Sequence, residues 1–200
     1  EASAIANFIN AATGRGALGA KENALVGLNT VFFAPRYVAS RFQLLAGQPF
    51  YRGTTRTRTL IAQEYGRFLA GAAMVYGLAQ KDGAEIETDP RSSDFGKIRY
   101  GNTRVEPLMG LSQITVLLTR LATGETKTLA RGKIVPIRGE KVPFGAGNSA
   151  DVIARFLRSK LSPMVGTSVD ILSGKNVGGE PVTPESVGKN LLVPLALKDI

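Results

Sequence analysis

The sequence predicts an α+β fold, predominantly an α-helical bundle with a central β-hairpin excursion. Apolar residues recur at helical spacing in the first and last thirds of the chain, and the middle alternates in the manner of strands. With 44% hydrophobic and 20% charged residues, the 200-residue chain lies in the ordinary range of proteins with a hydrophobic core. We therefore divide it into a helical part with an Arg- and aromatic-rich linker (1–82), β-hairpins with one helix (83–140), and C-terminal helices with a tail (141–200).

The first third is read as a series of helices separated by glycine and proline. Pro35 stops one helix and can serve as the first residue of the next, and Asp82-Gly83 ends the last. The expected helices cover residues 1–12, 23–34, 35–46 and 59–81, with a linker at 47–58. Because the chain opens in mid-helix without methionine, we expect one ordered piece of a much longer polypeptide.

The middle and the end change character twice. AEIETDP and the halves of KIRYGNTRVEP alternate as strands, and Gly101-Asn102 is a two-residue hairpin signal. LSQITVLLTRLATG predicts a helix with Ile114, Leu117, Leu118 and Leu121 on one face and Gly124 as its cap. TKTLARGKIVPI reads as two further short strands. Asn148 and Asp151 have capping-box spacing, so a helix is expected at 149–161. Ser162-Pro163 starts another helix, and Thr183-Pro184-Glu185 starts a short last one.

The residue types that are missing exclude several kinds of chemistry. The chain has no cysteine, no histidine and no tryptophan. Disulfides and Ser-His-Asp or Cys-His catalysis are therefore impossible within it, and a structural zinc site lacks its usual ligands. We predict no catalytic residue, no cofactor and no metal site.

Two motifs resemble functional sites by their letters. Gly14-Arg15-Gly16-Ala17-Leu18-Gly19 matches GxGxxG, but a helical segment precedes it where a dinucleotide site needs a strand, so we interpret it as a turn between helices. The acidic residues Asp82, Glu85, Glu87, Asp89 and Asp94 form one neighbourhood. Glu85 and Glu87 would share a strand face, which could hold a hard metal ion or an acid/base pair. We favour a solvated edge strand or a counter-charge to the arginines.

The net charge of +9 favours a polyanionic partner, or docking on an acidic part of the parent protein. The segment from Arg36 to Arg67 interleaves arginines with aromatic residues, which suits phosphate contact and base stacking. Equally open is a core role for the aromatic residues, with the arginines on acidic neighbours. The candidate contacts to nucleic acid or an acidic partner are Arg36, Arg41, Arg52, Arg56, Arg58, Arg67, Lys97, Arg99 and Arg104.

The segment 59–81 is the best membrane candidate. Its uncharged run, Phe68 to Gln80, is shorter than the roughly 20 apolar residues that span a bilayer. We favour a buried or oligomer-facing helix and leave transient membrane contact open.

Several segments together resemble a family. ATGRGALG, DPRSSDFGKIRYGNTRVEPLMG, DVIARFLRSKLSPMVG and VDILSGKNVGGEPVT resemble a C-terminal-type domain of the large polyvalent, internal virion (ejection) proteins of bacteriophages, over nearly all of the chain. The resemblance implies a non-enzymatic, structural domain inside the capsid near the portal, which takes part in genome packaging and delivery into the host. It implies as partners other copies of the chain, portal or other internal virion proteins, and phage DNA bound without sequence preference.

Two other hypotheses stand beside it. One is a nucleic-acid-binding module without sequence preference that acts in the host cell. The other is an enzyme that uses the acidic cluster around Glu85 and Asp89. The DPRSSDFGKIRYGNTRVEPLMG stretch itself is interpreted as a rigid hairpin that docks onto something acidic, with Lys97 and Arg99 on one face.

Overall fold

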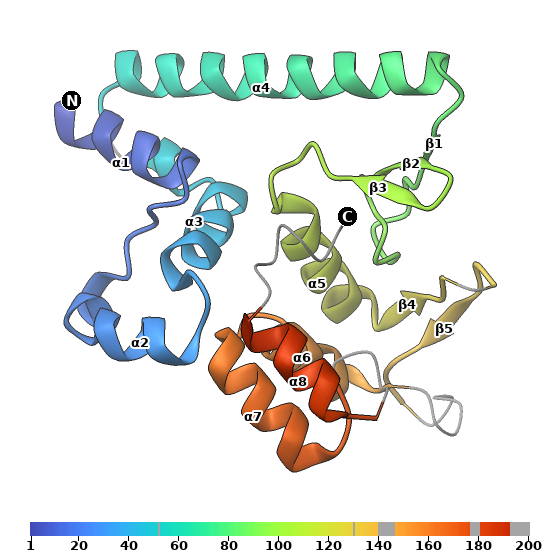
Figure 1. Cartoon of the computed structure of the whole chain (residues 1–200). Helices are drawn as coiled ribbons and strands as arrows, with labels where there is room; N and C mark the ends of the chain where they lie inside the picture. Colours follow the sequence, from blue (N-terminus) through green and yellow to red (C-terminus); the bar gives the residue numbers. More distant parts are fainter. Residues whose placement is uncertain (52, 130, 140–146, 177–180, 193–200) are drawn as a thin grey trace. The chain divides into compact units, whose positions relative to one another are not determined.

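The computed structural model describes residues 1–51, 53–129, 131–139, 147–176 and 181–192. The chain is 60% helical and has one antiparallel sheet of three strands and another of two, which confirms the predicted α+β, mostly helical class (Figure 1). Two compact units are present: Glu1–Ala17 with Arg36–Val152 (unit 1), and Leu18–Pro35 with Ile153–Ile200 (unit 2). Each unit combines two segments that are separate in the sequence. The limits of the units therefore differ from the division at residues 82 and 140 that the sequence suggested.

Unit 1 is built on helices α1 (Ala2–Ala12), α3 (Pro35–Leu45), α4 (Thr55–Lys81) and α5 (Leu111–Thr123), with the short 3-10 helix η2 (Gln48–Tyr51) before α4. The long helix α4 contacts α1, η2 and the first strand (Figure 1). It buries Thr57, Ile61, Ala72 and Ala79. With the half-buried Tyr65, Phe68 and Tyr76 they form one stripe in which successive residues are three or four positions apart, as one face of a helix requires. The opposite side of α4 is exposed.

Helix α4 begins four residues before the expected start at 59. The Thr54 side chain accepts a hydrogen bond from the backbone N–H of Thr57 at 3.4 Å and caps the helix. The predicted linker thus contains the cap and first turn of the helix, because threonine hydroxyls can satisfy the free N–H groups there.

The strands follow the predicted hairpins. β1 (Glu85–Ile86), β2 (Ile98–Tyr100) and β3 (Thr103–Val105) form the larger sheet, with Gly101-Asn102 as the turn between β2 and β3. β4 (Glu125–Lys127) and β5 (Ile134–Pro136) pair antiparallel directly after α5. Gly124 ends α5 with a φ of 70°, as predicted for its cap. β1 ends at Ile86, so Glu85 and Glu87 do not share one strand as expected.

The glycine motif after α1 is a turn, as the sequence indicates. The backbone of Gly16 packs directly on α3: its N–H donates to the Arg36 carbonyl at 3.1 Å, and an added Cβ would lie 2.3 Å from the Ser40 nitrogen. The glycine is therefore required for close backbone packing. No strand precedes the motif in the described chain, so the dinucleotide geometry is not formed.

Unit 2 contains the 3-10 helix η1 (Gly19–Ala24), α2 (Leu25–Val31), the end of α6 (Ser149–Arg158), α7 (Pro163–Ser173) and α8 (Pro184–Leu192). Ser162 joins two of these segments: its N–H donates to the Val31 carbonyl at 2.8 Å and its hydroxyl to the Thr30 carbonyl at 2.6 Å. The same hydroxyl accepts from the N–H of Val165 and caps α7. The expected capping box of α6 is confirmed by reciprocal bonds between Asn148 and Asp151.

Among the helices in the described ranges, none has the length and apolar character needed to cross a bilayer.

Candidate functional site

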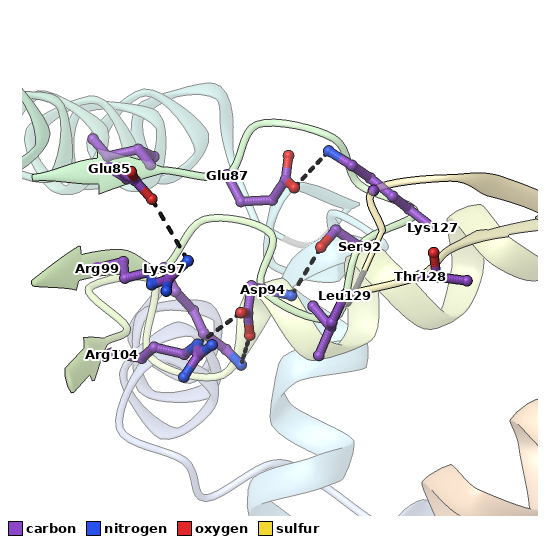
Figure 2. Close-up of a pocket in the computed structure, with 12 residues that line it drawn as sticks. Glu85, Glu87, Ser92, Asp94, Lys97, Arg99, Arg104, Lys127, Thr128 and Leu129 are labelled. Carbon is purple, nitrogen blue, oxygen red and sulfur yellow. Dashed lines mark hydrogen bonds and ion pairs between the residues drawn. The ribbon is translucent and has the colours of Figure 1, made fainter. Parts of the chain in front are cut away.

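A polar pocket of about 240 Å³ lies in unit 1 between the β1–β2–β3 sheet and the β4–β5 hairpin (Figure 2). Its lining combines residues 85–104 with Lys127, Thr128, Leu129 and Gly132. Seven charged side chains among the described residues line it: the acids Glu85, Glu87 and Asp94, and the cations Lys97, Arg99, Arg104 and Lys127. We call it the ion-pair pocket.

The DPRSSDFGK turn gives this pocket its shape. Ser92 is buried, and its hydroxyl accepts a hydrogen bond from the backbone N–H of Asp94 at 3.2 Å (Figure 2). Gly96 has a φ of 70°, and its carbonyl accepts a bond from the Tyr76 hydroxyl at 2.5 Å. An added Cβ there would lie 2.9 Å from Leu108, so both the backbone conformation and the space require glycine. The turn is thereby anchored on α4.

Asp94 is the centre of the pocket. Its carboxylate accepts bonds from the Lys97 ammonium at 2.9 Å and the Arg104 guanidinium at 2.7 Å, and its side chain is 18% exposed (Figure 2). Burial alone would raise the pKa of Asp94, but the hydrogen bonds and charges of Lys97 and Arg104 outweigh it and lower the pKa. Asp94 therefore stays ionised at neutral pH and pairs with two of the predicted contact residues, Lys97 and Arg104.

The other two acids of the pocket are paired as well. Lys127 of β4 donates to Glu87 at 2.6 Å, and Arg99 of β2 lies 3.6 Å from Glu85 (Figure 2). Burial opposes ionisation of Glu87, but its hydrogen bonds from Lys127 and from the Asp89 N–H lower its pKa. The Glu87–Lys127 pair joins the turn to the second hairpin.

A second ion-pair group, centred on Arg91, supports the pocket from beside it. Arg91 donates to Asp89 at 3.0 Å and to Glu125 at 2.7 Å. The side chain of Arg91 and then its backbone N–H lower the pKa of Asp89 to about 2. Arg120 of α5 donates to the Arg91 carbonyl and to Ser93, so α5 is fixed to the same turn.

This arrangement is suited to holding the fold together more than to acid/base catalysis. General acids and bases work best with a pKa near the working pH, whereas Glu87, Asp89 and Asp94 all have lowered pKa values. In the described ranges no three acidic side chains gather as metal ligands. Four acids of the predicted neighbourhood, Glu85, Glu87, Asp89 and Asp94, are therefore counter-charges to basic residues of the same part of the chain.

The nine predicted contact residues do not lie on one face. Lys97, Arg99 and Arg104 meet in the ion-pair pocket, where each has an acidic partner. Arg41 is buried in α3 with its guanidinium 4.5 Å from the centre of the Tyr37 ring, and Arg36 is half-buried in the same helix. Arg56, Arg58 and Arg67 are exposed on α4, where Arg67 pairs with Glu64. Arg52 lies outside the described residues.

Some of the aromatic residues interleaved with these arginines pack inside the fold, and others are exposed as a base-stacking surface requires. Phe50 and Tyr65 pack with ring centres 4.9 Å apart, and Phe8 lies 5.9 Å from Tyr65, as a core role requires. Tyr51 is 71% exposed. The predicted basic and aromatic surface is thus reduced to the start of α4 and its surroundings.

Sequence reasoning missed Lys127, Arg91 and Arg120 as members of these clusters. Lys127 lies 40 positions from Glu87, so no local spacing connects them. A signal was available for Arg91, since Asp89 two positions earlier accepts from its backbone N–H in the manner of an aspartate-initiated turn.

Comparison with protein-family models, with curated proteins and with solved structures finds no match to this chain.

Proposed function

We propose that this chain is a non-enzymatic structural domain of a bacteriophage internal virion, or ejection, protein. It is held in the capsid interior near the portal, contacts other copies of itself, portal or other internal virion proteins and packaged DNA, and enters the host with the genome. The sequence resemblance suggests the setting. The site contributes the physical argument, because Glu87, Asp89 and Asp94 act as ion-pair partners and their pKa values are lowered, away from neutral pH.

The observation that carries the DNA-facing part of this proposal is the state of Arg56 and Arg58. Both are exposed in the first two turns of α4, and neither has an acidic partner among the described residues. The first turn of α4 contains no acidic side chain. Cations at a helix N-terminus face the positive end of the helix dipole, so the fold itself gains nothing from them there. A polyanion at this end would compensate both the arginines and the dipole.

The proposed location in the capsid interior is tested on purified virions of the phage that encodes the chain. Peptides of this chain should be detected by mass spectrometry, protected from protease in intact particles and cleaved after the capsid is opened. An asymmetric reconstruction should then show density with fixed copy number at the portal. Absence of the chain from virions would contradict the proposal.

A second candidate function, a DNA-binding module acting in the host cell, rests on the same two arginines and has its own test. Binding of a short DNA duplex of arbitrary sequence should weaken as salt is raised. The logarithm of the binding constant should fall with the logarithm of the salt concentration, with a slope of about −0.9 per phosphate contacted. The Arg56→Gln/Arg58→Gln double variant should reduce that slope by about 2.

Arg99→Gln is the matched control for this measurement, because Arg99 is paired with Glu85. It should leave the slope unchanged. A slope that does not respond to Arg56→Gln/Arg58→Gln would remove these residues as the DNA contact. Binding by the isolated chain, together with absence from virions, would favour the host-cell function over the virion one.

A further inference from the structure

A second pocket, also inside unit 1, has the opposite character. It has a volume of about 290 Å³ and lies among α1, α3, α4 and the start of α5. Its walls are apolar: Phe8 and Ala12 of α1, Leu44 of α3, and Phe68 of α4 are among them. The volume lies just below the range of about 300–1,000 Å³ that is usual for pockets that take drug-sized ligands, so it suits a smaller organic molecule.

One charged side chain in this wall has no anionic partner. Arg41 is 4% exposed, and its Nε–H has no hydrogen-bond acceptor among the described residues. Its guanidinium stacks on the Tyr37 ring at 4.5 Å, which holds the group in place and leaves its charge uncompensated. Buried charges in proteins are normally paired, so an arginine in this state indicates a missing anion.

The rest of the lining does not supply that anion. Among the described residues of this wall Glu64 is the one acid, and its carboxylate already accepts a bond from Arg67. The Tyr65 hydroxyl donates to the Leu44 carbonyl at 3.3 Å. Tyr37 donates its hydroxyl to the carbonyl of Met109, which is 54% exposed and has a φ of 53°, so the same side chain positions both Arg41 and this edge of the pocket.

We propose that this pocket binds a small organic monocarboxylate with an apolar body, with the carboxylate on the Arg41 guanidinium and the body against Phe8, Leu44 and Phe68. A single buried guanidinium matches one negative charge, and its planar N–H groups have the fork geometry that suits a carboxylate. A dianion such as a phosphate monoester would leave a second charge against apolar walls. The inference does not depend on the proposed virion setting.

The test compares octanoate with 1-octanol, which share the apolar chain and differ in charge. Each is titrated into the ¹⁵N-labelled full chain and followed by NMR, including the Arg41 Nε–H resonance. Octanoate should bind at least about tenfold more tightly than 1-octanol, because a hydrogen bond between charged groups raises affinity by about this factor. Octanoate should also shift the Arg41 Nε–H resonance. Equal affinities, or no binding of octanoate, would overturn the proposal.

Two variants locate the binding. Arg41→Met should remove the preference for octanoate over 1-octanol. Because removal of a buried arginine can also disturb the fold, Ala12→Leu provides an independent test: it fills the pocket from α1 and should weaken both compounds at least about tenfold, with Arg41 in place. Ala73→Leu, the same change at an exposed position of α4, is the control and should bind both compounds like the unchanged chain. Binding that survives Ala12→Leu, or is lost equally in Ala73→Leu, would contradict the assignment to this pocket.

Discussion

The carboxylate of Glu87 accepts a hydrogen bond from the ammonium of Lys127 at 2.6 Å, although the two residues lie 40 positions apart. The pair connects the turn after β1 to the β4–β5 hairpin. Both side chains are about three-quarters buried, so solvent screens their attraction less than it does at an open surface. The ion-pair pocket is thus held by contacts between segments that reach each other only in the folded chain.

Glu87→Gln should destabilise the fold by about 1 kcal/mol. Glutamine keeps an oxygen that can accept from the Asp89 N–H, so the change removes the charge and leaves the local turn in place. Urea unfolding of Glu87→Gln, Lys127→Met and the double variant measures the pair as a double-mutant cycle. A coupling energy near zero would show that the pair does not stabilise the fold.

Acid should weaken the fold between about pH 4 and about pH 2. Asp89 has its pKa lowered to about 2 in the folded chain, against roughly 3.9 for an unfolded aspartate. The stabilisation from ionised Asp89 is therefore complete above the pKa of the unfolded chain, and it is lost as the pH falls through the pKa of the folded chain. Melting temperatures measured from pH 6 to pH 2 should decline in this window.

Asp89→Asn separates this group from the other acids. The variant should be less stable at pH 6, and its decline toward pH 2 should be shallower. Asp82→Asn serves as control, since Asp82 is exposed and has no ion-pair partner among the described residues. A decline that is identical in the unchanged chain and in Asp89→Asn would rule out the Arg91–Asp89 pair as its source.

Gly96→Ala should cost about 2–4 kcal/mol in the free energy of unfolding. Part of the cost is the positive φ, which adds about 1–2 kcal/mol for a residue with a side chain. The rest is the clash of the new methyl group with Leu108 and the Tyr76 hydroxyl. Gly101→Ala is the matched control: its φ is 55° and its surroundings are open, so it should cost about 1–2 kcal/mol. Equal losses would mean that the space around Gly96 is not tight.

Arg56→Glu should stabilise α4 and weaken DNA binding together. An acidic side chain in the first turn interacts favourably with the helix dipole, which is worth about 0.3–1 kcal/mol. Thermal unfolding at low ionic strength measures the gain, and the same protein titrated with duplex DNA measures the loss. If stability rises and DNA affinity stays the same, Arg56 is simply an unfavourable surface residue.

Local signals predicted much of the fold. The Gly101-Asn102 hairpin, the Gly124 cap, the Asn148–Asp151 capping box and the Ser162-Pro163 helix start are each fixed by residues within four positions of one another, and the structure confirms all of them. The start of α4 was placed too late because the Thr54 cap lies in a segment that looks like a polar linker.

Features set by contacts between distant segments were not predicted. The face proposed for α5 is partly wrong: Leu118 is 47% exposed whereas Val116 is buried, because helical spacing defines a stripe only to within neighbouring positions. Arg41 was expected on a basic surface, and only the packing of α1, α3 and α4 shows that it is buried. The sequence indicated that the acidic neighbourhood could be a counter-charge to the arginines, but it did not assign the pairs. In the structure Asp94 pairs with Lys97 and Arg104, and Glu85 pairs with Arg99.

Tyr37 has a consequence for how this chain can change over evolution. Its ring lies 2.9 Å from where a Cβ on Gly14 would be, and its hydroxyl lies 2.6 Å from where a Cβ on Gly110 would be. Neither glycine can be replaced while the tyrosine stays, and both have positive φ. A smaller residue at position 37 would relieve both contacts but would leave the positive φ at positions 14 and 110, so glycine should persist at both positions in homologous sequences even where the tyrosine has changed.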